Sequence, residues 1–203
     1  WMMLPWDLDL SLGQANNSTD ETLTTQDYPS GPCHPFYATQ AMPDYRNPAL
    51  WNKLIDVITG TPVFREMFVR RLRTLMDQFL KPPGSPAEEL YFEPRIQFFR
   101  TNMVADVVLD KARWASWGQS QTFDQALNLI ANGYLPGRRI HLFTNHSVLQ
   151  PGYPNNAGIP LAQSPSPQIR FGAMEANPAS GNQEEEYFQL LNETASAVDI
   201  SGW

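Results

Sequence analysis

NPALWNKLIDVITGTPVFREMFVRRLRTLMDQFLKPPG, residues 47–84, is the stretch with the clearest helical pattern in the chain. Asn47-Pro48 and Thr61-Pro62 each place a capping residue before a proline at the first helical position. Apolar side chains follow both starts at spacings of three and four residues, as on the buried face of an amphipathic helix. Gly60 ends the first segment and Pro82-Pro83-Gly84 ends the second, so the stretch predicts two successive helices.

Helical periodicity continues after this stretch. A third helix is expected over about residues 93–114 and a fourth over about residues 123–130. After Pro136-Gly137 the helix is expected to resume over about residues 138–143. Together these segments predict a helical, bundle-like lobe over about residues 48–143. Five large apolar side chains are expected inside it: Trp51, Phe68, Leu72, Phe99 and Met103.

The pattern changes in the last quarter of the chain. Residues 150–167 are rich in Pro, Gly, Asn and Ser with little periodicity, which is typical of a linker or an irregular crossover. Beyond them the apolar period becomes two, predicting one strand from about Ile169 and a second over residues 187–191. A helical unit followed by a strand unit predicts an α+β protein with two domains rather than one mixed layer.

Composition limits the classes of function. The 203 residues carry 14 Lys+Arg against 21 Asp+Glu, a net charge of −7, which argues against nucleic acid as the main partner. The single cysteine, Cys33, excludes an intrachain disulfide framework and a cysteine-based zinc ribbon. No apolar run approaches the roughly 20 residues of a membrane span. Both ends are apolar and in mid-pattern, so we expect the chain to be an excerpt of a longer protein.

Asp7 and Asp9 lie in an otherwise apolar run, WMMLPWDLDLSLG, at residues 1–13. In an extended segment, alternation places the two carboxylates on one face and apolar side chains on the other. Repulsion between the carboxylates is best relieved by a hard divalent cation, and Mg²⁺ prefers one or two carboxylates together with phosphate oxygens. A pair of solvated acids at a strand end is the alternative interpretation.

The run Leu4-Pro5-Trp6-Asp7-Leu8-Asp9-Leu10-Ser11-Leu12-Gly13 resembles the P-W-D-x-D-x-x-x-G signature of the spore-coat protein H (CotH) kinase family. Residues 47–54, residues 62–65 and the later segment over about residues 123–142 are also similar to that family. The resemblance covers about residues 1–146, and the opening motif is its specific part.

The resemblance implies a protein-kinase-like fold that transfers the γ-phosphate of ATP to protein hydroxyls, with Mg²⁺ and ATP as cofactors. It implies that Asp7 is a catalytic acid and a metal ligand, and that Asp9 is the second acid at the metal. This assignment agrees with the chemistry, because phosphoryl transfer depends on positioning and on neutralising phosphate charge with metal held by carboxylates. The nucleotide-clamping lysine, the glycine-bearing lobe and the catalytic-base segment would lie before Trp1, so these residues alone are not expected to be active.

Residues 169–178, 186–192 and 198–203 resemble the first part of a lamin-tail domain, which is an immunoglobulin-like β-sandwich. The two resemblances together imply three parts: residues 1–148 as the C-terminal part of the CotH kinase-like domain, 149–167 as a linker, and 168–203 as a truncated lamin-tail-like domain. They imply an extracellular, cell-surface or spore-coat location, with a protein substrate or an envelope or coat protein as partner. A non-catalytic surface or coat protein that keeps the kinase-like fold is the alternative function.

Several other polar groups are weaker candidates for a site. The arginine group Arg65, Arg70, Arg71 and Arg73 could grip phosphate or an acidic substrate, although a solvated helix face is the favoured interpretation. For Arg138 and Arg139 a structural role is favoured. Cys33-His34 lies in a Pro-rich loop, and His141 with His146 lacks further ligand-type partners, so neither pair predicts a nucleophile or a metal site. Asn16, Asn17, Asn145 and Asn192 each begin an N-x-S/T sequon.

Overall fold

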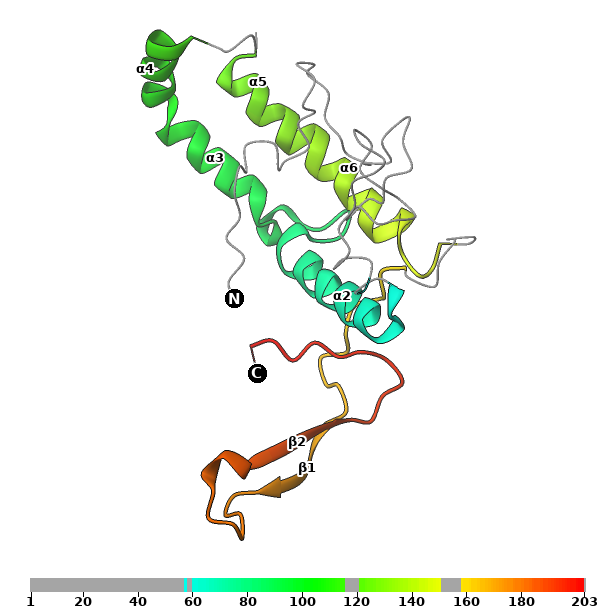
Figure 1. Ribbon diagram of the computed structural model, residues 1–203. Coiled ribbons are helices and arrows are strands. Elements are labelled where there is room, and N and C mark those ends of the chain that lie inside the picture. Colours follow the sequence, from blue (N-terminus) through cyan, green and yellow to red (C-terminus); the bar gives the residue numbers. More distant parts are fainter. Residues whose placement is uncertain (1–56, 58–59, 116–120, 151–157, 203) are drawn as a thin grey trace.

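The computed structural model of the chain describes residue 57 and residues 60–115, 121–150 and 158–202. These parts combine helices with a small antiparallel sheet of two strands, which is compatible with the expected α+β class. The helices gather at one end of the molecule, and the β1–β2 hairpin projects at the other (Figure 1). No helix in the described ranges combines the length and the apolar character needed to cross a bilayer.

Helix α2 spans Pro62–Leu75 and continues into the π-helical turns of η2, Met76–Leu80. The proline at its first position and the extended Thr61 before it begin the helix where the sequence predicts. The helix ends at Lys81, which adopts a left-handed φ of 65° and donates its backbone N–H to the carbonyl of Met76. Two prolines follow, so both predicted boundaries of this helix are confirmed.

The expected third helix is two helices. After the short turn η3, Ala87–Glu89, helix α3 spans Phe92–Asn102 and helix α4 spans Val104–Trp114, with a bend at Met103. Just before the bend, the hydroxyl of Thr101 donates to the carbonyl of Gln97, four residues earlier, and the Asn102 amide donates to Phe98 in the same way. Side chains that bond to carbonyls of the preceding turn bend helices, which accounts for the break.

The fourth helical segment is longer than expected. It runs through α5 (Phe123–Asn128), η4 (Leu129–Tyr134), α6 (Leu135–Ile140) and η5 (His141–Asn145) without a break. A capping box begins it, in which Thr122 and Gln125 each accept from the backbone N–H of the other. Pro136 does not interrupt it, because proline is tolerated in the first turn of α6, directly after the wider turns of η4.

The hydrophobic core lies between η2, α3 and the α5–η5 segment, and α3 packs against α5 and η4 (Figure 1). Its buried members are Met76, Leu80, Ile96, Leu127, Tyr134, Leu135, Leu142 and Ile159. The predicted core is partly wrong: Phe99 is 46% exposed and Met103 39% exposed, so neither side chain belongs to the buried cluster. Leu72 packs against the core and Phe68 is half-buried, while Trp51 lies outside the described residues.

Residues 158–161 pack against the helical lobe. Ile159 is fully buried in the core, and Ser147 and Ile159 form an isolated parallel bridge. The backbone N–H of Ile159 donates to the carbonyl of His146 over 2.7 Å, and that of Val148 donates to Ile159 over 3.0 Å. A side chain at Gly158 would lie 2.9 Å from the backbone of Val148, so this close approach requires glycine. The division of the chain at residues 149–167 stays a prediction.

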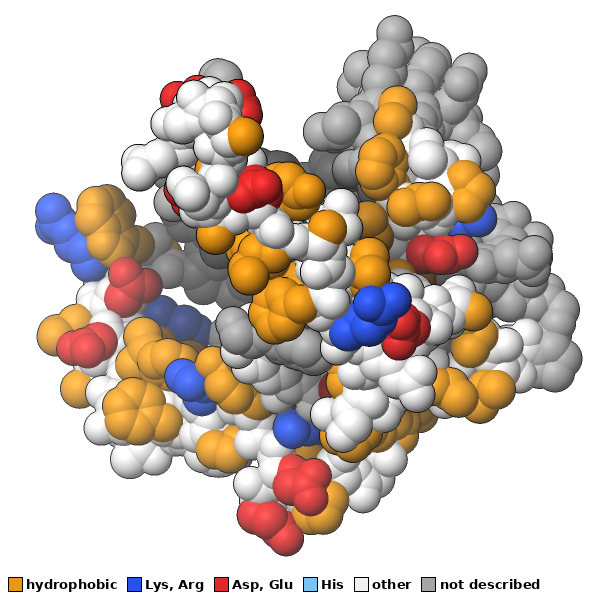
Figure 2. All heavy atoms as spheres, turned by 90° about the horizontal axis from the view of Figure 1, so that it is seen from below, with side chains coloured by type: hydrophobic (Ala, Val, Ile, Leu, Met, Phe, Trp, Pro, Cys, Tyr) orange, Lys and Arg blue, Asp and Glu red, His pale blue; other side chains and the backbone are white. Residues whose placement is uncertain are grey.

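Strands β1 (Ile169–Glu175) and β2 (Tyr187–Asn192) confirm the two predicted strands and pair antiparallel, with the short turn η6 (Gln183–Glu185) between them. Phe171 pairs with Leu190 and Met174 pairs with Phe188. Because the pairing is irregular between Phe171 and Met174, all four side chains lie on one face of the sheet. All four side chains are exposed. Viewed from below, where the hairpin lies in Figure 1, the surface carries several separate hydrophobic patches (Figure 2). The sheet formed by the described residues has these two strands, and the lamin-tail interpretation stays a prediction.

Leu135 and Leu129 offer a matched test of this core, since they lie six residues apart in one helical segment. Leu135 is 2% exposed and Leu129 is 37% exposed. We expect Leu135→Ala to lower the free energy of unfolding by about 2–5 kcal/mol, because it leaves a cavity. Leu129→Ala should cost about 1 kcal/mol or less. Urea unfolding followed by circular dichroism measures both, and equal losses would contradict the position of the core.

Candidate functional site

The residues with the strongest chemical prediction, Asp7 and Asp9, lie outside the described residues, as do Cys33 and His34. Their assignments as catalytic or metal-binding groups therefore stay predictions. Within the described ranges, no group of three or more His, Cys, Asp or Glu side chains is placed to hold a metal ion.

Two arginines of α2 hold the C-terminal segments against the helical lobe. Arg70 donates from Nε to the carbonyl of Ala197 over 3.1 Å and from Nη1 to the carbonyl of Leu161 over 2.8 Å. Arg73 donates from Nη1 to the carbonyl of Pro160 over 3.0 Å. Both arginines are buried, so the prediction of a solvated helix face is wrong for them. Their donors bind backbone carbonyls, which argues against a phosphate-binding role.

The buried charge of Arg73 is compensated within its own helical segment. Its Nε donates to both carboxylate oxygens of Asp77, at 2.9 and 3.0 Å, and its guanidinium lies 4.9 Å from the centroid of the Phe143 ring. Burial and the neighbouring positive charge of Arg73 lower the pKa of Arg70. Fixed acceptors around both guanidinium groups therefore compensate the repulsion between these two positive charges.

Asp199 extends the same interface to Arg71, whose side chain is about half exposed. Its carboxylate accepts from Arg71 over 3.1 Å, and its backbone exchanges two hydrogen bonds with the side chain of Gln163, at 2.8 and 3.0 Å. Burial raises the pKa of this carboxyl, but hydrogen bonds from Ser201, Thr74 and Arg71 outweigh burial and hold the pKa below its ordinary value. We call Arg70, Arg71 and Arg73, with the segments 160–163 and 197–199 that they hold, the arginine clamp.

Arg139 has the structural role that the sequence favours. Its Nη1 lies 2.7 Å from a carboxylate oxygen of Glu93, and its Nε donates to the carbonyl of Leu80 over 2.8 Å. These bonds tie α6 to the start of α3 and to the last residue of η2. Loss of the carboxylate partner would leave the buried cation uncompensated, so these contacts hold the elements in one arrangement.

His141 and His146 form a buried aromatic pair that the sequence interpretation missed. Their ring centroids lie 4.2 Å apart in an edge-on arrangement, and His141 is fully buried. Neither ring nitrogen of His141 has a hydrogen-bond partner among the described residues. Burial first, then the nearby His146 and Arg138, lowers the pKa of His141 to about 3. His141 is therefore uncharged near neutral pH.

The spacing of the two histidines explains how they meet. His146 is the fifth residue after His141, and its backbone N–H donates to the carbonyl of His141 over 3.0 Å. This i→i+5 bond belongs to the π-helical turn η5, which brings residues five apart onto one side. In a regular α-helix, residues three or four apart are the neighbours, so helical periodicity alone would not predict this contact.

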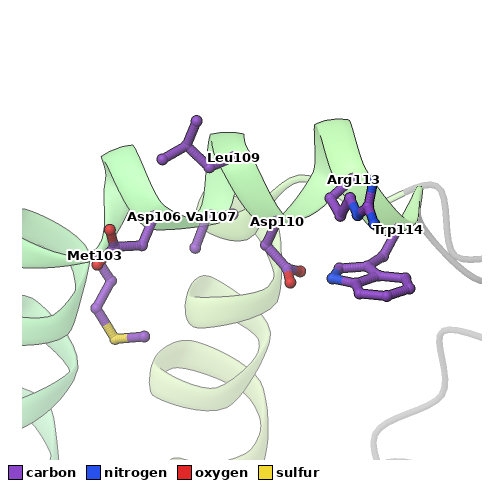
Figure 3. A pocket seen from close by; sticks show the side chains of 7 residues that line it. All are labelled: Met103, Asp106, Val107, Leu109, Asp110, Arg113 and Trp114. Carbon is purple, nitrogen blue, oxygen red and sulfur yellow. The ribbon is translucent and has the colours of Figure 1, made fainter.

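Two hollows are lined by described residues and could receive a ligand. One, of about 200 Å³, lies beside the arginine clamp and is lined by Glu66, Val69, Arg70, Val148, Gly158, Pro160 and residues 195–197. The other, of about 550 Å³, lies along α4 and is lined by Met103, Asp106, Val107, Leu109, Asp110, Arg113 and Trp114 (Figure 3). We call it the α4 groove. In the first hollow Arg70 already donates to two carbonyls, so the α4 groove is the more open to a ligand.

Comparison with known proteins gives a family match over the first part of the chain. A family model described as CotH kinase protein matches residues 1–135, about two thirds of the chain. No curated protein and no solved structure matches. The matched range contains the Asp7/Asp9 motif and most of the helical lobe, and it ends before the clamp segments and the hairpin.

The arginine clamp predicts different effects for two adjacent arginines. Arg70→Ala leaves the carbonyls of Leu161 and Ala197 without their donor, so hydrogen exchange in residues 158–163 and 195–201 should accelerate by about tenfold or more. Arg71→Ala removes an ion pair whose arginine side chain is about half exposed, and Ser201 and Thr74 still bond to Asp199, so it should accelerate exchange only a few-fold. Exchange measured by mass spectrometry checks both variants. If the two variants accelerated exchange equally, the bonds of Arg70 would not be what holds the two segments in place.

The histidine pair predicts a loss of stability in acid. Because the pKa of His141 lies below the 6.5 of the unfolded chain, only the unfolded chain gains a proton there as the pH falls below that value. Stability should then decline by up to about 1.4 kcal/mol per pH unit. His141→Leu should remove this part of the decline. Urea unfolding of both proteins at about pH 7 and about pH 5 measures it, and parallel declines would contradict the assignment.

Proposed function

Because the chain belongs to the CotH kinase protein family, we propose that it is part of a Mg²⁺- and ATP-dependent protein kinase of the CotH type. In this proposal the γ-phosphate of ATP is transferred to a hydroxyl group of a protein substrate. The observation that supports it most directly is the acidic motif Pro5-Trp6-Asp7-Leu8-Asp9 within the matched range.

Asp7 has the central role in the proposed reaction. Its carboxylate would hold Mg²⁺ against the phosphate oxygens of ATP, and Asp9 would bind the same metal or orient Asp7. Two carboxylates are the donor type that Mg²⁺ prefers, so the chemistry of this pair fits the cofactor. When bound, the metal neutralises phosphate charge during transfer. The two residues therefore supply charge and position rather than a covalent intermediate.

The described lobe supports this proposal as a rigid scaffold. Arg139 ties α6 to Glu93 of α3 and to the end of η2, and Arg73 ties α2 to Asp77 and to Pro160. Catalytic groups contribute most when the protein around them is held in fixed positions, and these contacts fix the helices of the lobe. We propose that the nucleotide-clamping lysine and the catalytic-base segment belong to other parts of the protein, which acts on extracellular, cell-surface or spore-coat proteins.

A second function is supported by the β1–β2 hairpin. Phe171, Met174, Phe188 and Leu190 share one exposed face of a two-stranded sheet. Exposed apolar faces of this kind are found at protein–protein contacts, so this one favours a binding or coat-forming role. In that case the family fold would serve as a structural support without phosphoryl transfer. The lamin-tail-like assignment of residues 168–203 belongs to this proposal.

Asp7→Asn tests the proposed catalytic role. In the full-length gene product that carries these residues, we expect the rate of phosphoryl transfer to fall by roughly two to four orders of magnitude, about 3–5 kcal/mol, because one carboxylate no longer neutralises the metal. Asp9→Asn should also reduce the rate, by a smaller factor. Phosphate incorporation into protein and ATP consumption, both with Mg²⁺, are the measurements.

Glu88→Gln is the matched control, since it neutralises an exposed carboxylate on η3. It should leave the rate unchanged within about twofold, and thermal melts should show that all three variants are folded. Full activity in Asp7→Asn would contradict the metal-ligand assignment. A folded but inactive wild-type protein that binds a partner would favour the second function.

A further inference from the structure

Helix α4 is unusually apolar for a helix that lies at the surface. Val104, Val108, Leu109 and Trp114 are each more than half exposed, and Val107 is the only half-buried residue of the helix. A surface helix usually turns its apolar side chains toward the core and its polar ones toward water. Here apolar and charged side chains are both exposed, which is typical of a surface that another molecule covers.

The α4 groove has an apolar floor with carboxylates beside it. Met103, Val107, Asp110 and Trp114 project to one side of the helix (Figure 3). Asp106 and Asp110 lie one helical turn apart along this side. The volume of about 550 Å³ falls within the range of roughly 300–1,000 Å³ for ligand sites, enough for a few side chains of a partner.

The two carboxylates lack the cation that three other acids of the lobe have. Asp77, Glu93 and Asp124 each pair with an arginine. Among the described residues, neither Asp106 nor Asp110 forms an ion pair or a hydrogen bond through its carboxylate. The described lining of the groove carries these two carboxylates and one cation, Arg113, so its net charge is negative.

The two cations at this end of the helix, Lys111 and Arg113, already have contacts of their own. Lys111 donates its ammonium to the carbonyl of Gln121 over 2.8 Å. Arg113 lies over the ring of Trp114, with 5.3 Å between the guanidinium carbon and the ring centroid. That contact indicates that the indole face accepts a guanidinium, because its π-electrons attract cations.

We infer that the α4 groove is a docking surface for a basic, amphipathic segment of a protein partner. Apolar side chains of that segment would pack on Met103, Val107 and Trp114, while its Lys or Arg side chains would pair with Asp106 and Asp110. A helix laid into a groove makes contacts of this kind through residues three and four apart. Charge complementarity selects this occupant, since the carboxylates repel nucleic acids and anionic lipid surfaces. The inference does not depend on the proposed phosphoryl transfer.

The test measures binding of a dye-labelled Leu/Lys peptide, about four helical turns long with leucines at helical spacing, to the whole chain by fluorescence anisotropy. A matched peptide with glutamate in place of every lysine is the comparison. We expect the lysine peptide to bind at least about tenfold more tightly than the glutamate peptide, and its affinity to fall as salt is added.

Two double variants with the same change in net charge locate the site. Asp106→Asn/Asp110→Asn should weaken binding of the lysine peptide by about tenfold, whereas Glu88→Gln/Glu89→Gln, on the exposed turn η3, should change it by less than about twofold. Trp114→Ala should also weaken binding. Asp106→Lys/Asp110→Lys should reverse the preference toward the glutamate peptide, which a merely unfolded helix would not do.

Four results would overturn the inference. These are no binding of the lysine peptide to the wild-type chain, equal binding of the two peptides, equal weakening in the two neutralised double variants, and stronger binding to vesicles of anionic phospholipid than to the lysine peptide. Circular dichroism of each variant establishes that the helical content is retained.

Discussion

The contact between the guanidinium groups of α2 and the backbone carbonyls of the C-terminal segments is the interaction on which the arrangement of this molecule depends. Arg70 and Arg73 place two like charges close together in the interior, which is tolerable only when acceptors surround both. Asp77 and the carbonyls supply these acceptors, and the same carbonyls would be unsatisfied without the arginines. The helical lobe thus supplies hydrogen-bond donors to the C-terminal segments, and these segments supply acceptors to the lobe. In this member of the kinase family, the contact fixes the segments that follow the helical lobe against helix α2.

Local signals in the sequence predict the helices and strands well. Thr61-Pro62 and Pro82-Pro83 mark the ends of one helical segment because proline geometry decides them without reference to distant residues. The alternation from Ile169 onward is equally local, and both strands lie where it places them. The exposed positions of Phe99 and Met103 are not predictable in this way. Periodicity indicates which side of a helix is apolar, but another element must cover that side for it to be buried.

The functional features depend more on distant contacts. The acceptors of Arg70 lie 91 and 127 residues away along the chain, so its charge pattern alone favours a solvated face. His141 and His146 meet because a π-helical turn replaces the usual spacing, and helical propensity does not predict that turn. For Asp7 the reverse holds, because a short motif and the family match support a chemical role that lies outside the described residues.

The acceptors in the clamp also bear on how these segments can diverge. Arg70 and Arg73 bind main-chain oxygens of Pro160, Leu161 and Ala197, which every amino acid provides. The identity of the side chains at the receiving positions is therefore nearly irrelevant to the bonds, whereas the arginines themselves have no substitute with the same planar set of donors. Substitutions at the acceptor positions are therefore tolerated by the contact, whereas substitutions of the two arginines are not. Related chains could thus carry different C-terminal modules on the same lobe, provided the backbone follows the same path.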